Sequence, residues 1–106
     1  MPTNEYHILH SLEEFNAFLN NETGLILFHK KLCPHCKVMH TVVGKVTAQD
    51  PDIIVATVDS EEHPELLRKA GVERVPTLCV VKNGAIRAKN TGILNPRETL
   101  TLIYNA

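Results

Sequence analysis

The sequence lacks the features that mark several functional classes. Its 106 residues carry a formal net charge of only −1, and so small a balance gives no support for binding to nucleic acid or to a membrane surface. No apolar stretch approaches the ~18 residues that a membrane span needs. The N-terminal residues 1–7 contain no basic segment followed by an apolar run, so we expect no secretory signal. These absences lead us to expect a cytoplasmic protein.

Cysteine is scarce, with three residues in the whole chain. An odd number, in a chain for which no signal is expected, argues against a framework of structural disulfides. Two of the three form the segment Cys33-Pro34-His35-Cys36. In a reducing compartment, so close a pair is more often catalytic or metal-binding than structural. Cys79 lies inside the apolar run 78–81 and is expected to be a small buried side chain.

The chain shows no repeat, low-complexity tract or linker, so its length predicts a single domain over residues 1–106. Short unbroken apolar runs predict strands covered on both faces, at residues 25–28, 53–56 and 78–81. A short first strand is expected near residues 6–9. Helical spacing, cap residues at Ser11 and Asn95, and Gly71 as a helix stop predict helices over residues 11–20, from residue 33 past residue 46, over residues 60–70, and from residue 95 onward. Asn83-Gly84 predicts a hairpin between residues 78–82 and 86–91.

The predicted elements alternate between strand and helix and end in a hairpin. Such an order is typical of an α/β fold, and the hairpin adds an antiparallel edge to a parallel sheet. We therefore expect a central mixed sheet of about five strands flanked by about four helices.

The position of Cys33 suits it to thiol–disulfide exchange, in which the thiolate is the nucleophile. A free cysteine has a pKa of about 8.5, so little of it is ionised at neutral pH. Pro34 fits the first turn of a helix, and the start of a helix favours negative charge on Cys33. His35 can add a positive charge or a hydrogen bond, and residues 23–49 contain four lysines and no acidic residue. Cys36, one turn inside the helix, can then resolve a mixed disulfide on Cys33.

A metal site is the alternative for the cysteine pair, with His29, His35 or His40 as further ligands. A second Cys-x-x-Cys segment, which a typical four-cysteine zinc site needs, is absent. Lys37 follows Cys36, which excludes the haem-attachment motif. The position of the pair at a helix start, directly after a buried strand, favours redox chemistry and no bound metal.

These segments together resemble the thioredoxin family, from about Tyr6 to Tyr104. The matching landmarks are Cys33-x-x-Cys36, Asp59, Val75-Pro76-Thr77, Lys82-Asn83-Gly84 and Gly92. The resemblance implies the thioredoxin fold and an enzyme that needs no cofactor beyond its own Cys33–Cys36 redox disulfide. It also implies a substrate-binding surface at Val75, Pro76 and Gly92, with Pro76 cis and with the backbone of Val75 pairing with substrate like an added strand.

The chain departs from that family at its most typical segment. Thioredoxins usually have Trp-Cys-Gly-Pro-Cys, whereas here Leu32 precedes Cys33 and the chain contains no tryptophan. The Pro34-His35 pair resembles the oxidants of the DsbA type, but the chain lacks their inserted helical domain. It is therefore more similar to the atypical small thioredoxins with a Cys-Pro-His-Cys site.

The usual proton acceptor for the second cysteine is also missing. Leu27 stands where the resemblance would place a buried aspartate, and Val55 stands where its lysine partner would be. We hypothesise that His35, His29 or water takes this role. His40 is expected on the solvent-facing side of its helix.

The sequence thus predicts a reductase of protein disulfides that takes its electrons from a donor of the thioredoxin reductase type and works as a monomer. Three alternatives stay open: an oxidant or isomerase of DsbA-like character, a metal-binding module, and a binding module that only presents Val75 and Pro76. Lys30 and Lys31 either attract acidic partners to the site or simply form a solvated turn.

Overall fold

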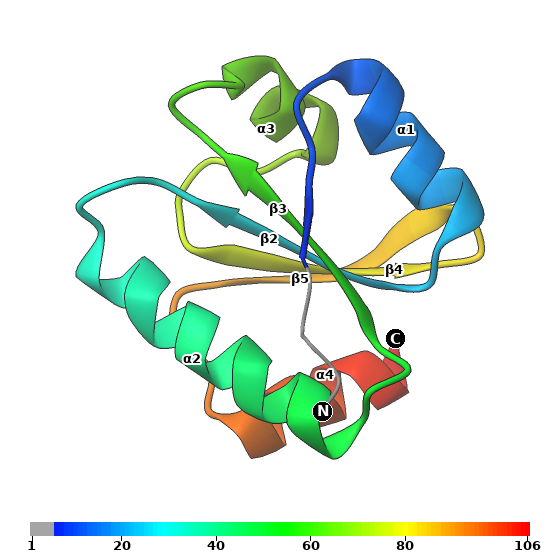
Figure 1. Cartoon of the computed structure of the whole chain (residues 1–106), viewed down its shortest axis with the longest axis vertical. Coiled ribbons are helices and arrows are strands. Elements are labelled where there is room, and N and C mark those ends of the chain that lie inside the picture. The colour runs from blue at the N-terminus through cyan, green and yellow to red at the C-terminus, as the bar shows by residue number, and fades with distance from the viewer. Residues whose placement is uncertain (1–5) are drawn as a thin grey trace.

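The computed structural model describes residues 6–106 as one sheet between two layers of helices (Figure 1). Nine elements follow one another: β1 (His7–Ile8), α1 (Leu12–Asn21), β2 (Gly24–His29), α2 (Pro34–Gln49), β3 (Ile54–Asp59), α3 (Pro64–Ala70), β4 (Thr77–Lys82), β5 (Ala85–Thr91) and α4 (Pro96–Asn105). Helices α1 and α3 cover one face of the sheet, and α2 and α4 cover the other. The predicted fold, a mixed five-stranded sheet flanked by four helices, is confirmed.

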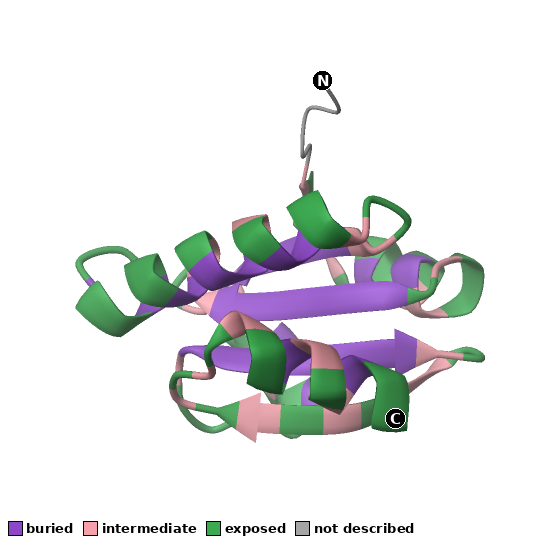
Figure 2. Ribbon diagram, turned by 90° about the horizontal axis from the view of Figure 1, so that it is seen from below, coloured by how far each residue is buried: buried purple, intermediate pink, exposed green. Residues whose placement is uncertain are grey.

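The strand order β1-β3-β2-β4-β5 places β2 in the middle of the sheet. Strand β2 runs parallel to β3 and antiparallel to β4. Its first five residues are buried, because helices cover both faces, and Figure 2 shows the central strands as a buried layer between exposed helix surfaces. Alternate residues of β2 therefore contribute to two separate apolar clusters, with Ile26 and Phe28 in one and Leu25 and Leu27 in the other.

The third strand and the third helix differ from their predicted bounds. Strand β3 continues to Asp59, whereas the apolar run ended at residue 56. Helix α3 begins at Pro64 rather than at residue 60. The reason is local, since a residue that precedes proline is held away from the helical conformation and proline itself fits the first turn. Gly71 ends the helix in the left-handed conformation at φ 70°, as its place in the sequence predicted.

The predicted hairpin and the predicted cap of the last helix are both confirmed. Asn83 and Gly84 have φ values of 54° and 80°, which is the backbone that a tight two-residue turn requires. At α4, the side chain of Asn95 accepts a hydrogen bond from the N–H of Glu98, and Glu98 accepts one from the N–H of Asn95. At α1, the side chain of Ser11 likewise accepts a hydrogen bond from the N–H of Glu14. The carboxylate of Glu14, however, accepts a hydrogen bond from the N–H of His10 and not from the N–H of Ser11.

Candidate active site

The cysteine pair lies where β2 leaves the sheet and α2 begins, at the left-hand tip of Figure 1. Three exposed residues, Lys30, Lys31 and Leu32, form the connecting turn. Leu32 has φ 54°, a left-handed backbone that is unfavourable for a leucine. Its side chain is 94% exposed. The turn therefore holds a large apolar side chain in solvent directly beside Cys33.

A disulfide joins Cys33 to Cys36, whose Cα atoms lie 5.2 Å apart. Cys33 is the N-cap of α2, and its Sγ accepts a hydrogen bond from the backbone N–H of Cys36 at 3.2 Å. Pro34 occupies the first turn of the helix, as predicted. Such a cap places the sulfur at the positive end of the helix, where a negative charge is stabilised.

The two cysteines differ in how far they are exposed to solvent. Cys33 is 8% exposed and Cys36 is 2% exposed. A partner can therefore reach Cys33 first, while Cys36 lies beneath it. This order agrees with the predicted roles of Cys33 as nucleophile and Cys36 as resolving residue.

A second chain segment, between α3 and β4, completes the site. The Val75–Pro76 peptide bond is cis, as the resemblance implied. Val75 lines a hollow of about 410 Å³ together with five residues of the cysteine segment and its turn: Lys30, Leu32, Cys33, Pro34 and His35. The fold therefore brings together residues that lie at least forty positions apart in the sequence.

Hydrogen bonds fix this second segment from behind. The hydroxyl of Thr77 donates to the carbonyl oxygen of Arg74 at 2.6 Å, and its Oγ1 lies 2.8 Å from that of Thr91. The N–H of Gly92 donates to the carbonyl oxygen of Pro76 at 2.9 Å. Within residues 6–106, neither the N–H nor the C=O of Val75 takes part in a hydrogen bond. Gly92 thus supports Pro76 and is not among the residues that line the hollow, while the backbone of Val75 is available to a partner.

The two positions at which the resemblance would place a buried aspartate and its lysine partner both carry apolar side chains. Leu27 is fully buried and Val55 is 2% exposed. Both belong to the apolar cluster that also includes Met39 of α2. Neither Leu27 nor Val55 can therefore act as the proton acceptor for Cys36.

His40 is half-buried, so the expectation that it faces solvent was wrong. Its ring meets that of His29 edge to face at a centroid distance of 5.0 Å and stacks on Tyr6 at 6.4 Å. Burial lowers the pKa of both histidines. The carboxylates of Asp59 and Glu62 oppose this shift at His29, whereas His29 reinforces it at His40. The sequence signal for this contact was weak, because His40 borders the apolar face of α2.

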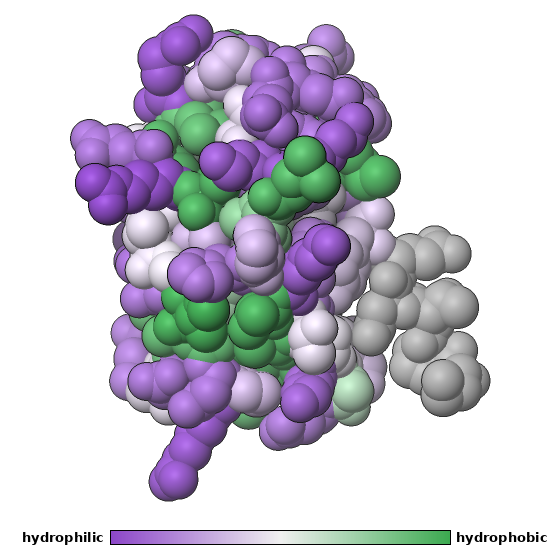
Figure 3. All heavy atoms as spheres, turned by 90° about the vertical axis from the view of Figure 1, so that its left-hand side faces the viewer, coloured by the Kyte–Doolittle hydropathy of each residue, from purple (hydrophilic) through white to green (hydrophobic). Residues whose placement is uncertain are grey.

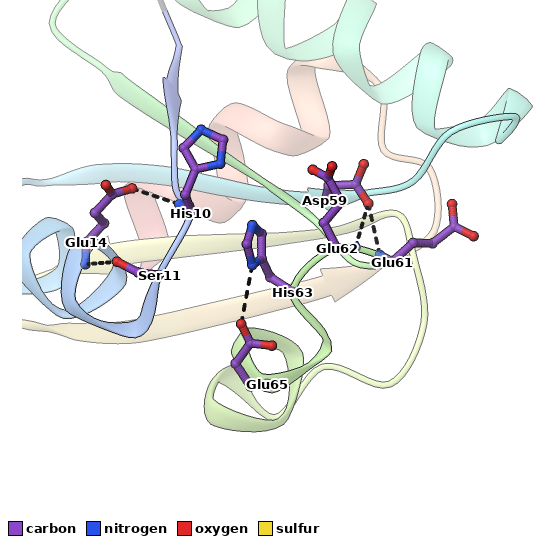
Figure 4. Close-up of polar contacts among 8 residues, drawn as sticks. All are labelled: His10, Ser11, Glu14, Asp59, Glu61, Glu62, His63 and Glu65. Atoms are coloured by element: carbon purple, nitrogen blue, oxygen red, sulfur yellow. Dashed lines mark hydrogen bonds and ion pairs between the residues drawn. The ribbon is translucent and has the colours of Figure 1, made fainter.

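Asp59 has a structural role at the end of β3 (Figure 4). Its Oδ1 accepts hydrogen bonds from the N–H groups of Glu61 at 2.9 Å and Glu62 at 3.3 Å. Nδ1 of His63 lies 3.3 Å from a carboxylate oxygen of Glu65 in the first turn of α3, and Figure 4 marks this contact with a dashed line. These contacts shape the loop that leads into α3.

Three further observations concern the third cysteine, metal binding and membrane-spanning helices. Cys79 is fully buried, and burial raises the pKa of its thiol to about 12, so it remains protonated at neutral pH. Among the described residues, no three His, Cys, Asp or Glu side chains lie close enough together to hold a metal ion. None of the helices within residues 6–106 is long and apolar enough to span a bilayer.

Comparison with known proteins agrees with this arrangement. The thioredoxin family model matches residues 7–105. Thioredoxin from Chlamydia caviae is 28% identical over 93 residues, which are 88% of this chain and 91% of that protein. Mitochondrial thioredoxin from Bos taurus is 35% identical over 77 residues, covering 71% of this chain, which thus aligns with 46% of that longer protein.

The solved structure of desulfothioredoxin from Desulfovibrio vulgaris Hildenborough, in its reduced form, is similar over nearly the whole chain. It superposes with a TM-score of 0.78 and 37% sequence identity, covering 99% of this chain and 94% of that one. The chain therefore shares its fold with proteins of one family, and its Cys33–Cys36 pair fits a Cys-x-x-Cys active site.

Proposed function

Because this chain belongs to the thioredoxin family and is a thiol–disulfide oxidoreductase, we propose that it works mainly as a reductase of protein disulfides in the cytoplasm. The observation that carries the proposal is the placement of Cys33. Its sulfur caps α2 and accepts a hydrogen bond from the N–H of Cys36, the residue lines an open hollow, and Cys36 is more deeply buried.

The proposed cycle begins with the reduced pair. The Cys33 thiolate attacks one sulfur of a substrate disulfide, which forms a mixed disulfide and releases the other substrate sulfur as a thiolate. Cys36 then loses its proton to the hypothesised acceptor, His35, His29 or water, and attacks Cys33 Sγ, which closes the Cys33–Cys36 disulfide and releases the second substrate sulfur as a thiolate. The substrate gains two electrons and two protons, and the cysteine pair loses the same number. In the mixed disulfide, the free backbone of Val75 pairs with the substrate chain like an added strand.

The net direction depends on the midpoint potential of the pair. Two reference potentials serve as anchors for comparison, about −270 mV for thioredoxin and about −120 mV for DsbA. The difference between them corresponds to about 7 kcal/mol in the dithiol–disulfide equilibrium. The helix cap, His35 and the nearby lysines stabilise the Cys33 thiolate and hence the reduced form, which raises the potential. We expect a midpoint between the anchors and net reduction in a compartment that keeps thiols reduced.

The proposal also covers the electron donor, the cellular compartment and the oligomeric state. A donor of the thioredoxin reductase type would return two electrons to the Cys33–Cys36 disulfide after each cycle. A reducing compartment suits Cys79, a buried thiol that has no cysteine partner. We propose a monomer, and sedimentation of the reduced and oxidised protein would measure this directly.

A redox titration with trapping of free thiols tests the proposal. Purified protein is equilibrated in dithiothreitol or glutathione buffers, and the wild type is compared with Cys33→Ser. We expect one two-electron transition in the wild type, with a midpoint between the two anchors, and none in the variant. A midpoint near that of DsbA would instead favour an oxidant, and protected thiols with bound metal would overturn the redox proposal.

A further inference from the structure

The charges around the disulfide are distributed unevenly. Residues 23–49 contain four lysines and no acidic residue, while the rest of the chain contains twelve acidic and seven basic residues. Three of these lysines, Lys30, Lys31 and Lys37, are exposed on the turn before α2 and on its first turns. The chain segment that carries the cysteine pair is therefore basic within a chain whose net charge is −1.

The hollow at Cys33 shares this positive character. Lys30 and His35 line it, and no carboxylate does. A second hollow of about 440 Å³ adjoins it, because Lys30 and Val75 line both. The second hollow has mixed charge, with Glu61 and Glu73 beside Lys30 and Arg74. The first hollow, at Cys33, is therefore lined by basic side chains alone among its charged residues, whereas carboxylates offset the basic side chains of the second hollow.

Apolar surface lies next to these lysines. The exposed side chain of Leu32 is at the edge of the first hollow, and the half-buried Val75 separates it from the second. Figure 3 views this end of the molecule and shows two areas of apolar surface, one above the other, with hydrophilic side chains between and around them. An apolar patch with a charged border is typical of a protein-binding site.

We infer that the site selects protein segments in which acidic side chains flank the reacting cysteine. The inference rests on the proposed function and specifies its substrate class. A partner segment that crosses the hollow would place its sulfur on Cys33, its apolar atoms on Leu32 and Val75, and its carboxylates beside Lys30 and Lys31. Complementary charge raises the rate of encounter more than the strength of the final complex, so the selection acts on the second-order rate constant of reduction.

Three peptide disulfides test the inference. They are identical except that the reacting cysteine is flanked by two aspartates, two asparagines or two lysines, and each is linked to the same neutral thiol. Stopped-flow mixing with the reduced protein gives the second-order rate constant. At low salt we expect the aspartate peptide to react about five- to tenfold faster than the lysine peptide, since each exposed ion pair contributes at most about fivefold. Screening at high salt should remove most of the difference.

Charge-reversal variants locate the effect. Lys30→Glu/Lys31→Glu should invert the ranking, whereas Lys45→Glu/Arg87→Glu, which makes the same charge change at exposed sites elsewhere, should preserve it. Ratios between peptides are compared, because a change in Cys33 reactivity would alter all three rates together. Equal rates in the wild type, or a ranking that survives in Lys30→Glu/Lys31→Glu, would overturn the inference alone. If even the asparagine peptide is not reduced, the proposed function fails, and the inference fails with it.

Discussion

The helices α2 and α4 begin in almost the same way but have different functions. Both lie on the same face of the sheet (Figure 1). Both have proline in the first turn, and in both the N-cap side chain accepts a hydrogen bond from the backbone N–H three residues later. The cap atom is a sulfur in α2, at Cys33, and an amide oxygen in α4, at Asn95.

The difference lies in the residue three positions after each cap. In α4 this residue is Glu98, whose carboxylate accepts a hydrogen bond from the N–H of Asn95 and neutralises the positive helix end. In α2 it is Cys36, and the first turn has no acidic residue. The positive end of α2 is therefore left to stabilise a charge on Cys33. One capping geometry thus serves stability in α4 and reactivity in α2.

Replacing Cys33 with serine should produce the largest effect. Serine is a good N-cap, so the start of α2 should persist and the free energy of unfolding of the reduced protein should change by no more than about 1 kcal/mol. Disulfide reduction should fall to the background rate, since a hydroxyl is not ionised at neutral pH. Urea unfolding and reduction of a disulfide-bonded protein measure the two quantities.

Replacing Cys36 with serine is the matched control, because it leaves the nucleophile in place. This variant should attack once and retain the substrate as a mixed disulfide on Cys33, visible as a mass increase that dithiothreitol removes. Trapping at Cys36 in Cys33→Ser instead would reverse the assigned roles.

An acidic residue in the first turn of α2 should make it more similar to α4. In His35→Glu, the new carboxylate should raise the pKa of Cys33, destabilise the reduced form and lower the midpoint potential. The expected shift is about 30 mV for each pKa unit, because both correspond to about 1.4 kcal/mol. His35→Gln removes the imidazole without adding charge and should shift the potential less. Equal shifts in the two variants would show that charge at this position is not the cause.

Weakening the cap of α4 should affect stability alone. Asn95→Ala removes the acceptor for the N–H of Glu98 and should cost about 1 kcal/mol in the free energy of unfolding. Glu98→Gln should cost less, since glutamine can still accept from the N–H of Asn95. Urea unfolding measures both losses. A changed midpoint potential in either variant would mean that the two helix starts are not independent.

The sequence predicted most of the fold because its signals are local. Unbroken apolar runs, the Asn83-Gly84 turn and the caps at Ser11 and Asn95 each depend on a few neighbouring residues. The wrong start of α3 was also a local matter, since Pro64 is a stronger signal than the apolar residues on which the predicted helix was based.

The candidate site was harder to predict from the sequence, because it depends on contacts between distant segments. Cys33 and Val75 share a hollow only because the sheet order places their loops together, so the sequence alone reached Val75 through a family resemblance. The left-handed backbone of Leu32 carries no sequence signature, since leucine rarely adopts it. His40 lies next to Met39, at the border of the buried face of α2, and contacts with Tyr6 and His29 decide its burial.

The second turn of α2 offers a last and smaller contrast with α4. Seven residues after the cap, α2 has His40 and α4 has Leu102, and both are half-buried. The pKa values of His40 and His29 are lowered in the folded state, so the unfolded chain binds more protons once the pH falls below about 6.5. Stability should therefore be constant above that pH and should decrease below it.

The substitution His40→Leu should make this decrease shallower, because only His29 then contributes, and there Asp59 and Glu62 partly offset the effect of burial. Urea unfolding of the reduced protein between pH 7.5 and about 5.5 compares the variant with the wild type, and His10→Gln, at an exposed histidine, serves as the control. An equally steep decrease in His40→Leu would show that acid sensitivity arises elsewhere. A shallower one would assign part of it to the ring contact between α2 and the end of β2.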